Sequence, residues 1–565
     1  MILLNEGYKK YRAFPAKQLP DRTWPQNRLT KAPVWCSVDL RDGNQALINP
    51  MEKDQKLDFF KMLTKIGVKE IEVGYPASSS TEYEVLRALI DGGLIPQDVT
   101  VQVLTQTRED LITRTFDALE GAENVILHIY NNLSVLQREV VFKTDFAGVK
   151  EIAVNGAAIA KKLGDKARAD GMKLRYEYSP ESFMECEPDE VIEVCAAVLD
   201  TLGATEEDKV IINLPTTVEC TLPNSFADIV EYFCRNLPGR ERAIISIHPH
   251  NDRGTGVASA ELAQLAGAER VEGTLFGNGE RTGNVDMVTL AMNLFTQGVD
   301  PKLDFSHIMQ VRDLYERTTG MRVPERQPYA GALVLTAFSG SHQDAINKGL
   351  HRLQDTNSPY WRVPYLPIDP ADLGRQYDPI VRINSQSGKG GAAFIMETNF
   401  GYVLPKAMHA QFGAIVQKET ERSGSELDAE RIFQLFKSEY IDVDSPYKLK
   451  NHAFKEERGE EHPVVRFSGT LYKDEEVFEI SGVGNGPIDA FFNAVSNMKI
   501  ANFHFLSYSE HAISSGSDSR AVAYIQLRAP NGDQVFGVGI SHNIYLASIR
   551  GIICAINREI KKGLD

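Results

Sequence analysis

Between about residues 33 and 310 the sequence alternates short apolar runs with longer segments of helical periodicity. The helical period is clearest in Met51–Ile66, Phe146–Leu163 and Pro188–Leu202. Short apolar runs between such segments are typical of parallel strands. Eight of them predict an α/β fold, the TIM (β/α)8 barrel, with functional side chains at the carboxyl ends of the strands. The predicted strands are Val34–Val38, Glu70–Val73, Thr100–Leu104, Val125–Ile129, Leu174–Tyr178, Val210–Asn213, Ala243–Ile247 and Val271–Leu275.

An open, doubly wound sheet fits the same alternation, so the choice rests on polar residues at the strand ends. Asp42 follows the first predicted strand, His248 and His250 end the seventh, and Asn284 follows the eighth. In a closed barrel, strands seven, eight and one are neighbours, and these four side chains gather at one mouth. An open sheet gives no such convergence. We therefore expect the sheet to close.

The pattern changes after about residue 320. Residues 321–435 are rich in proline, glycine and polar residues, which predicts linker subdomains with short helices. Beyond them, Glu479–Asn497 and Phe536–Asn557 each place glycines before a helical stretch, and Asn531-Gly532 is a hairpin signal. These blocks predict a small pseudo-symmetric α+β domain, in which the glycines serve turn geometry alone or also contact a ligand. The expected parts are an N-terminal arm (1–32), the barrel (33–320), the linker subdomains (321–435) and the C-terminal domain (436–565).

Composition narrows the class of protein. A chain of 565 residues is too long for one core, and no apolar run approaches the ~20 residues of a membrane span. The first thirty residues lack the apolar core of a signal peptide, so we expect a cytoplasmic protein. A net charge of −16, with scattered basic residues, argues against nucleic acid or anionic membrane as partners. The six cysteines form no Cys-x-x-Cys pair, which fits a reducing compartment.

The segment His248-Pro249-His250 carries the most specific chemical signal. Residues two apart on a strand point the same way, roughly 6–7 Å apart, so both imidazoles can reach one ion. Two ordinary histidines at a strand end are the alternative for an isolated pair. With Asp42 and Asn284 they make a mixed nitrogen and oxygen site that suits Zn²⁺, Mn²⁺, Mg²⁺ or Co²⁺. Such a site predicts Lewis-acid catalysis on a chelating substrate such as a 2-oxo acid.

Arg41, beside Asp42, is a candidate to stabilise the alkoxide formed on attack at a carbonyl, with a structural ion pair as its alternative role. Other chemistries lack their motifs. No Gly-x-Gly-x-x-Gly follows the first strand, which argues against a nicotinamide cofactor. The sequence also lacks a Gly-x-Ser-x-Gly elbow and a Walker lysine motif.

Three blocks resemble the signature segments of the 2-isopropylmalate and homocitrate synthase family: Leu40–Gln45, His248–Asp252 and Gly277–Asn284. The resemblance covers essentially the whole chain and is strongest to the long bacterial and fungal type. It implies a barrel of the pyruvate carboxyltransferase-like type and a metal-dependent Claisen-type condensation. Acetyl-CoA, 3-methyl-2-oxobutanoate and water would give (2S)-2-isopropylmalate and CoA, the first committed step toward leucine. A divalent ion (Mg²⁺, Mn²⁺ or Zn²⁺) and a monovalent activator such as K⁺ are the expected cofactors.

The resemblance also assigns roles by position. It implies a homodimer in which His342 and Tyr365 reach the partner subunit's active site. The base that deprotonates acetyl-CoA stays open between His342 and Glu181. The remaining assignments are metal ligation by Asp42, His248, His250 and Asn284, contact with the oxo acid by Arg41, a grip on its carboxylate by Thr217, and pocket-lining by Leu104, His128, Ser179 and Asn213.

The C-terminal domain resembles the family's leucine-binding regulatory domain, which implies feedback inhibition by leucine. Synthases of homocitrate or citramalate, a lyase that cleaves a related CoA ester and a non-catalytic amino-acid sensor are the alternatives. The complete set of metal-site residues argues against a sensor, and the long C-terminal extension argues against a lyase. The expected allosteric residues are Gly482, Gly484, Gly486, Gly537, Gly539 and Ala547.

Overall fold

The chain divides into two units in the computed structural model. The first unit comprises Met1–Leu335 and Ile368–Gln376, and the second comprises Thr336–Pro367 and Tyr377–Asp565. The structure describes residues 6–15, 17–337, 339–377, 391–423, 427–441, 443–458, 463–473, 475–498, 502–513 and 519–562.

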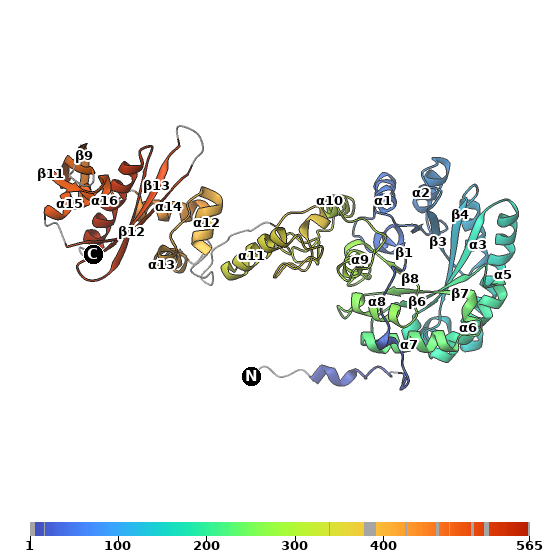
Figure 1. Ribbon diagram of the computed structural model, residues 1–565. Helices are drawn as coiled ribbons and strands as arrows, with labels where there is room; N and C mark the ends of the chain where they lie inside the picture. The colour runs from blue at the N-terminus through green and yellow to red at the C-terminus, as the bar shows by residue number, and fades with distance from the viewer. Residues whose placement is uncertain are drawn as a thin grey trace. The chain divides into compact units, whose positions relative to one another are not determined.

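The first unit is built on a closed barrel of eight parallel strands, β1 to β8 in chain order (Figure 1). Closure comes from β1, which pairs with β2 on one side and with β8 on the other. The TIM barrel predicted from the sequence is confirmed. The strands are β1 (Val34–Ser37), β2 (Glu70–Gly74), β3 (Thr100–Gln106), β4 (Asn124–Asn132), β5 (Lys173–Glu181), β6 (Val210–Thr216), β7 (Ala243–Pro249) and β8 (Arg270–Gly273).

Several strands run further toward their carboxyl ends than the apolar runs predicted. β4 and β5 stay paired as far as Asn132 and Glu181, although their last side chains are polar. A polar strand end at this face of a barrel is where functional groups stand. The extensions therefore carry the predicted site residues on rigid, hydrogen-bonded backbone.

Helices surround the barrel and cover its apolar outer face (Figure 1). Local sequence explains their limits. Ser79 caps α2 by accepting a hydrogen bond from the backbone N–H of Glu82. α6 starts at Pro188 and is terminated by Gly203, whose φ is +71°. The helices are α1 (Lys53–Lys65), α2 (Ser80–Asp91), α3 (Glu109–Ala118), α4 (Val135–Gln137), α5 (Phe146–Ala169), α6 (Pro188–Leu202), α7 (Pro223–Asn236), α8 (Gly256–Leu265), α9 (Met287–Thr296) and α10 (Ile308–Thr319).

Charged side chains fill much of the barrel interior. Arg270 of β8 is fully buried, and its Nε donates to Oε2 of Glu70 on β2 at 2.6 Å. Its other nitrogens reach Gln102 Oε1 on β3 at 2.7 Å and Ser246 Oγ on β7 at 2.9 Å. Contacts between strands that are not neighbours in the sheet must cross the inside of the barrel. The interior therefore holds an ion-pair network where most TIM barrels have layers of aliphatic residues.

The N-terminal arm includes two 3₁₀ turns, η1 (Glu6–Lys10) and η2 (Trp24–Gln26). Trp24 is buried and its Nε1 donates to Asp228 on α7 at 2.7 Å. The hydroxyl and backbone N–H of Thr23 both donate to the buried carboxylate of Glu231. These bonds attach the arm to the outside of the barrel.

The second unit contains two three-stranded antiparallel sheets, each followed by a helix (Figure 1). One sheet has the order β11-β10-β9 and precedes α15, and the other has the order β12-β13-β14 and precedes α16. This repeat confirms the predicted pseudo-symmetric α+β fold. Its elements are β9 (Tyr447–Arg458), β10 (Pro463–Lys473), β11 (Glu476–Gly484), α15 (Pro487–Asn497), β12 (His504–Ala512), β13 (Ala521–Arg528), β14 (Gln534–Ser541) and α16 (Ile544–Lys562).

Further helices precede the sheets: α11 (Gly340–Thr356), α12 (Gly391–Phe400), α13 (Lys406–Ser423) and α14 (Ala429–Tyr440). Side chains of α12, α13 and α14 share one buried apolar cluster with β13 and β14. The boundary predicted at residue 435 falls inside α14, and the limits of the four predicted parts stay predictions. No helix among the described residues is long and apolar enough to cross a membrane.

Four of the five glycines singled out in the second unit lie where a strand approaches a helix very closely. A Cβ on Gly482 of β11 would collide with the backbone carbonyl of Ala490 on α15. A Cβ on Gly539 of β14 would collide in the same way with Ala547 on α16. At Gly486 a Cβ would meet open space. Close packing of strand on helix, which the sequence analysis did not consider, accounts for the first two glycines.

Candidate active site at the barrel mouth

The loop after β1 presents Arg41 and Asp42. It forms a single π-helical turn, η3 (Asp39–Gly43), most of which is buried. Lys56 of α1 is fully buried, and its Nζ donates to the carbonyl oxygen of Leu40 at 2.8 Å. This bond braces the turn from behind, so the two functional side chains leave a fixed backbone.

The loop after β8 brings Asn284 beside the end of β7. His250 and Asn284 form an isolated antiparallel bridge. The backbone N–H of Val285 donates to the carbonyl oxygen of Pro249 at 2.8 Å. Pairing to β7 therefore places the carboxamide and both histidines on one side of the mouth.

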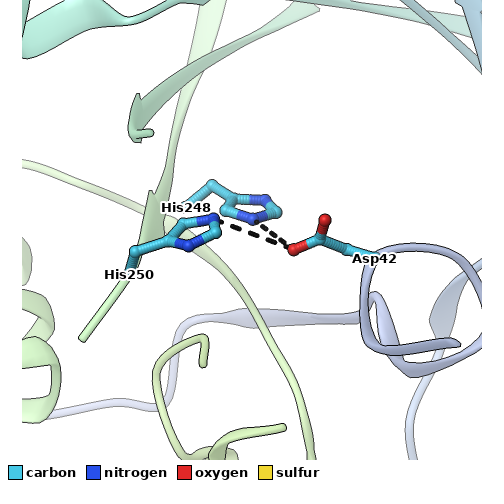
Figure 2. Close-up of side chains that lie close together, drawn as sticks. All are labelled: Asp42, His248 and His250. Carbon is cyan, nitrogen blue, oxygen red and sulfur yellow. Dashed lines mark ion pairs between the residues drawn. The ribbon is translucent and has the colours of Figure 1, made fainter. Parts of the chain in front are cut away.

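Asp42, His248 and His250 converge on one point (Figure 2). Oδ2 of Asp42 lies 3.5 Å from Nε2 of His248 and 3.8 Å from Nε2 of His250, and all three side chains are buried. Nδ2 of Asn284 donates to Asp42 at 2.8 Å, while its buried Oδ1 has no partner among the described residues. An orphaned oxygen beside two imidazoles and a carboxylate fits the donor set of a divalent cation.

The three side chains differ in the direction in which their surroundings shift their pKa values. Burial disfavours the ionised form of Asp42, but Arg41 and the histidines outweigh it and hold the pKa of Asp42 well below its ordinary value. Burial also disfavours a charged ring at His248, but hydrogen bonds to Asp42 and Glu272 outweigh it and raise the pKa to about 9. Burial and the neighbouring His248 lower the pKa of His250 to about 4. The site thus offers one ionised carboxylate and one neutral imidazole near neutral pH.

Glu72, His128 and Glu272 form a second group whose ligand atoms lie within 4.8 Å of one another. The amide of Gln102 occupies the space between the two carboxylates. Its Nε2 donates to Glu72 Oε2 at 2.6 Å and to Glu272 Oε1 at 2.8 Å. Because these donors already satisfy the oxygens, we interpret this group as part of the barrel interior.

A cavity of about 430 Å³ opens at the mouth. Every residue predicted for the barrel site lines this cavity except Asn284, which donates a hydrogen bond to Asp42. The lining residues are Arg41, Asp42, Gln45, Tyr75, Leu104, His128, Tyr130, Ser179, Glu181, Asn213, Pro215, Thr217, His248, His250, Glu280 and Arg281.

One wall of the cavity is a hydrogen-bonded row from neighbouring strands. Nε2 of His128 lies 2.7 Å from Oγ of Ser179, which also accepts a hydrogen bond from Nδ2 of Asn213 at 3.0 Å. Oγ1 of Thr217 accepts from the backbone N–H of Ser182 at 2.8 Å, which leaves the threonine hydroxyl hydrogen free to donate. Burial raises the pKa of Glu181 above its ordinary value.

His342 and Tyr365 belong to the second unit. Their rings stack with centroids 3.9 Å apart and planes inclined by 22°. The structure therefore brings these two predicted residues together, although 23 positions separate them along the chain. Their expected place in the partner subunit's active site stays a prediction.

Sequence reasoning missed Gln45, Tyr75, Tyr130, Pro215, Glu280 and Arg281 as lining residues. Two signals could have found some of them. Tyr130 stands two positions after His128 on the same strand, so both side chains point the same way. Glu280 and Arg281 lie inside the Gly277–Asn284 block that the resemblance rests on.

A separate cavity of about 370 Å³ lies in the second unit, at the start of α15. Of the six expected allosteric residues, only Gly486 lines it. Its walls are Asn485, Gly486, Pro487, Ile488, Asp489, Phe492, Phe505, Tyr508 and Tyr545.

Three family models match consecutive parts of the chain. The HMGL-like model matches residues 32–315, the model for the alpha-isopropylmalate synthase post-catalytic domain matches residues 332–397, and the LeuA allosteric (dimerisation) domain matches residues 426–560. The first covers the barrel, and the third covers both sheets of the second unit.

Curated relatives match over the full length. A 2-isopropylmalate synthase from Clostridium acetobutylicum is 53% identical over 554 residues, which cover 98% of this chain and 99% of the relative. The enzyme of the same name from Rhodospirillum rubrum is 51% identical, with 97% and 98% covered. That of Pseudomonas entomophila is 50% identical, with 100% and 99% covered.

Proposed function

Because this chain belongs to the 2-isopropylmalate synthase family, we propose that its barrel condenses acetyl-CoA with 3-methyl-2-oxobutanoate and water. The methyl carbon of acetyl-CoA bonds to the carbonyl carbon of the oxo acid, and water cleaves the thioester to release CoA. The product is (2S)-2-isopropylmalate, and the chain is an acyltransferase of leucine biosynthesis. The observation that carries the proposal is the convergence of Arg41, Asp42, His248, His250 and Asn284 at one mouth.

We assign the cation site to Asp42, His248, His250 and Asn284, with Mg²⁺, Mn²⁺ and Zn²⁺ as candidate ions. Such an ion, when bound, supplies Lewis acidity at the carbonyl of the oxo acid. A monovalent activator such as K⁺ stays a prediction from the resemblance.

Arg41 is the group that we assign to the developing negative charge. Its Nη1 donates to Asp42 Oδ1 at 3.0 Å and its Nε donates to Glu72, so the guanidinium is held at the edge of the cavity. A fixed cation aimed at an oxygen that gains charge lowers the barrier without reorganising during the reaction. Thr217, with its free hydroxyl hydrogen, is suited to hold the carboxylate of the oxo acid.

The isopropyl group requires an apolar surface, and Leu104, Pro215 and the ring of His128 supply one in the cavity. A methylene in such a pocket is worth about 1–3 kcal/mol, so related oxo acids should react weakly. Neither the barrel fold nor the cation ligands select among oxo acids. This wall therefore decides between 2-isopropylmalate and the homocitrate or citramalate alternatives.

For removal of the methyl proton we propose His342, with Glu181 as the second candidate. An imidazole nitrogen can accept a proton as a general base, and the Tyr365 ring packs on the ring of His342. Glu181 lines the cavity, and burial raises its pKa toward the range that a base requires. Exchange of the acetyl-CoA methyl hydrogens with deuterium oxide separates them: the variant that lacks the base loses exchange, and the other retains it.

Leucine inhibition and a homodimer are the regulatory part of the proposal. The match to the LeuA allosteric (dimerisation) domain supports both. We assign leucine to the cavity at the start of α15, whose aromatic walls suit an apolar side chain. Tyr508→Ala should weaken inhibition by leucine and leave uninhibited turnover unchanged. Tyr472→Ala, in the same unit but outside the cavity, is the matched control.

A thiol-release assay with a panel of 2-oxo acids tests the reaction. CoA release should require an oxo acid and be fastest with 3-methyl-2-oxobutanoate. Preference for 2-oxoglutarate or pyruvate would move the chain to homocitrate or citramalate synthesis. Leucine binding without CoA release from any oxo acid would favour the amino-acid sensor. His250→Ala should lose bound metal and turnover while it stays folded, because His250 lies beyond the last residue of β7.

A further inference from the structure

We propose that Glu272 is a positioning residue that keeps the ring proton of His248 on Nδ1, so that Nε2 faces the cation site. The inference rests on the proposed cation ligands and deepens that assignment. Glu272 lies on β8, is fully buried and does not line the cavity. It therefore acts through His248 and contacts no substrate.

The contact is direct. Oε2 of Glu272 lies 2.7 Å from Nδ1 of His248, which is a short hydrogen-bond distance. A carboxylate oxygen accepts, so the hydrogen of this bond belongs to Nδ1. The opposite nitrogen, Nε2, is the atom 3.5 Å from Oδ2 of Asp42. A carboxylate behind a ligating histidine both selects the tautomer and fixes the plane of the ring.

Glu272 itself is held from both sides. Its Oε1 accepts from Arg270 Nη1 at 3.0 Å and from Gln102 Nε2 at 2.8 Å. Its Oε2 also accepts from Asn213 Nδ2 at 3.0 Å. With three donors besides His248, the carboxylate is an acceptor on each oxygen and cannot rotate away. The same carboxylate joins the cation ligand to the pocket wall that Asn213 forms.

Among the residues that the structure describes, no carboxylate contacts Nδ1 of His250. Its Nδ1 lies 2.9 Å from Nη2 of Arg281, a group that only donates. Burial alone would treat the two histidines alike, since both are buried at the same strand end. The opposite character of their partners shows that the carboxylate is specific to His248.

Glu272→Gln tests this role directly, because glutamate has two acceptor oxygens whereas glutamine has one acceptor oxygen and one donor nitrogen. Arg270 and Gln102 both require an acceptor at the Oε1 position, so the amide nitrogen would take the Oε2 position. There Asn213 can turn its unpartnered Oδ1 toward the new amide, and Nδ1 of His248 becomes the acceptor. In the neutral ring that binds a cation, this places the proton on Nε2 and turns the lone pair away from the cation site. Loss of such a partner typically weakens metal binding about 10–100-fold.

Glu70→Gln is the matched control. Glu70 is a buried carboxylate of β2 that pairs with the same Arg270, at 2.6 Å, and with Arg175, also at 2.6 Å. It contacts no histidine among the described hydrogen bonds. In Glu70→Gln the amide nitrogen would face an arginine donor inside the barrel. The variant therefore measures how far disturbance of the buried network alone changes Mn²⁺ binding.

The full-length chain, stripped with a chelator, is titrated with Mn²⁺ by calorimetry. Glu272→Gln should bind Mn²⁺ about 10–100-fold more weakly, and Glu70→Gln should stay within about threefold of the unsubstituted chain. The proposal is overturned if both variants shift together or if Glu272→Gln binds as tightly as the unsubstituted chain. If Glu272→Gln does not fold, Glu272→Asp replaces it in the test. The shorter side chain keeps the negative charge but moves it away from His248, so this variant must show the same loss of Mn²⁺ affinity.

The same titration of His248→Ala separates the role of Glu272 from the assignment of the cation ligands. If His248→Ala still binds Mn²⁺ with unchanged affinity, the cation ligands themselves are wrong. If it loses Mn²⁺ while Glu272→Gln does not, the ligands stand and only the positioning role of Glu272 fails.

Discussion

Nη2 of Arg281 lies 2.9 Å from Nδ1 of His250 and also donates to the backbone carbonyl of Thr217, while Nε of Arg281 donates to Asp252. A guanidinium donates, so this bond occupies the lone pair of Nδ1 and leaves the ring proton on Nε2, the atom that faces Asp42. The contact therefore opposes ligation by His250.

Removing this contact should strengthen metal binding. We expect Arg281→Met to bind Mn²⁺ several-fold more tightly in calorimetry, whatever its effect on turnover. Arg281→Lys keeps the positive charge but loses the guanidinium nitrogen that contacts His250, so it should also bind Mn²⁺ more tightly. If only the methionine variant gains affinity, charge and not the hydrogen bond is responsible. Arg242→Met, which removes an arginine paired with Asp200 on the barrel surface, is the control and should change nothing.

Mixed subunits test the proposed sharing of active sites. Arg41→Ala and His342→Ala should each be inactive alone. If His342 serves the partner's barrel, co-refolding equal amounts should restore about a quarter of normal activity, because half of the dimers then carry one intact site. Arg41→Ala with His250→Ala is the control: both residues belong to the barrel, so each barrel keeps a lesion and no activity should return. Equal recovery in both mixtures, or none in either, contradicts the arrangement.

The tight contact between β14 and α16 predicts a stability effect. Gly539→Ala should lower the melting temperature of the second unit by several degrees, because its Cβ collides with the backbone of Ala547. Gly486→Ala should leave it unchanged, because its Cβ meets open space. Differential scanning calorimetry measures both. A leucine response lost in Gly539→Ala with an unchanged melting temperature would instead support direct contact between this position and leucine.

Asp39 predicts a pH dependence of stability. Burial raises its pKa from 3.8 to about 7 in the folded chain, while the unfolded carboxyl keeps its ordinary value. The folded state thus holds a proton that the unfolded state releases, so this residue's contribution to stability falls as pH rises from about 4 to about 7. At about 1.4 kcal/mol per pKa unit, the loss amounts to a few kcal/mol.

Asp39→Asn removes this titration. The urea midpoint of the barrel is measured for the variant and for the unsubstituted chain at pH 5 and at pH 8. The gain of the variant over the unsubstituted chain should be larger at pH 8, by an amount that reflects those few kcal/mol. The exposed Asp117→Asn should show no such difference between the two pH values. A constant offset for Asp39→Asn at both pH values would mean that the carboxyl is ionised throughout.

Much of the barrel could be predicted from the sequence because parallel strands covered on both faces are continuous apolar runs. All eight strands lie where those runs predicted them. The predicted limits were wrong where a strand continues past the apolar run into polar or charged residues. β8 was predicted from Val271 to Leu275, but it runs from Arg270 to Gly273. Arg270 looks like a solvent-facing residue until its partners on other strands, up to 200 positions away, are known.

The candidate site divides in the same way. Asp42, His248, His250 and Asn284 could be gathered from the sequence, because barrel closure brings the ends of three strands together. Glu272 could not, because nothing local marks a carboxylate that faces inward and meets a histidine on the neighbouring strand. The second unit shows the complementary difficulty: its glycine pattern was visible, but its cause, close packing of strand on helix, exists only in three dimensions.

The charged interior of the barrel has a consequence for how this enzyme can change. In most TIM barrels, residues that confer stability and residues that confer activity occupy opposite ends and can be altered separately. Here Arg270 binds Glu70 and Glu272 at once, and Glu272 contacts a candidate metal ligand. A substitution that improves the core therefore also shifts the reaction centre. Thermostabilised variants of this chain should arise from its surface, its helix caps and its second unit, while the barrel interior should resist redesign unless several of its charges are replaced together.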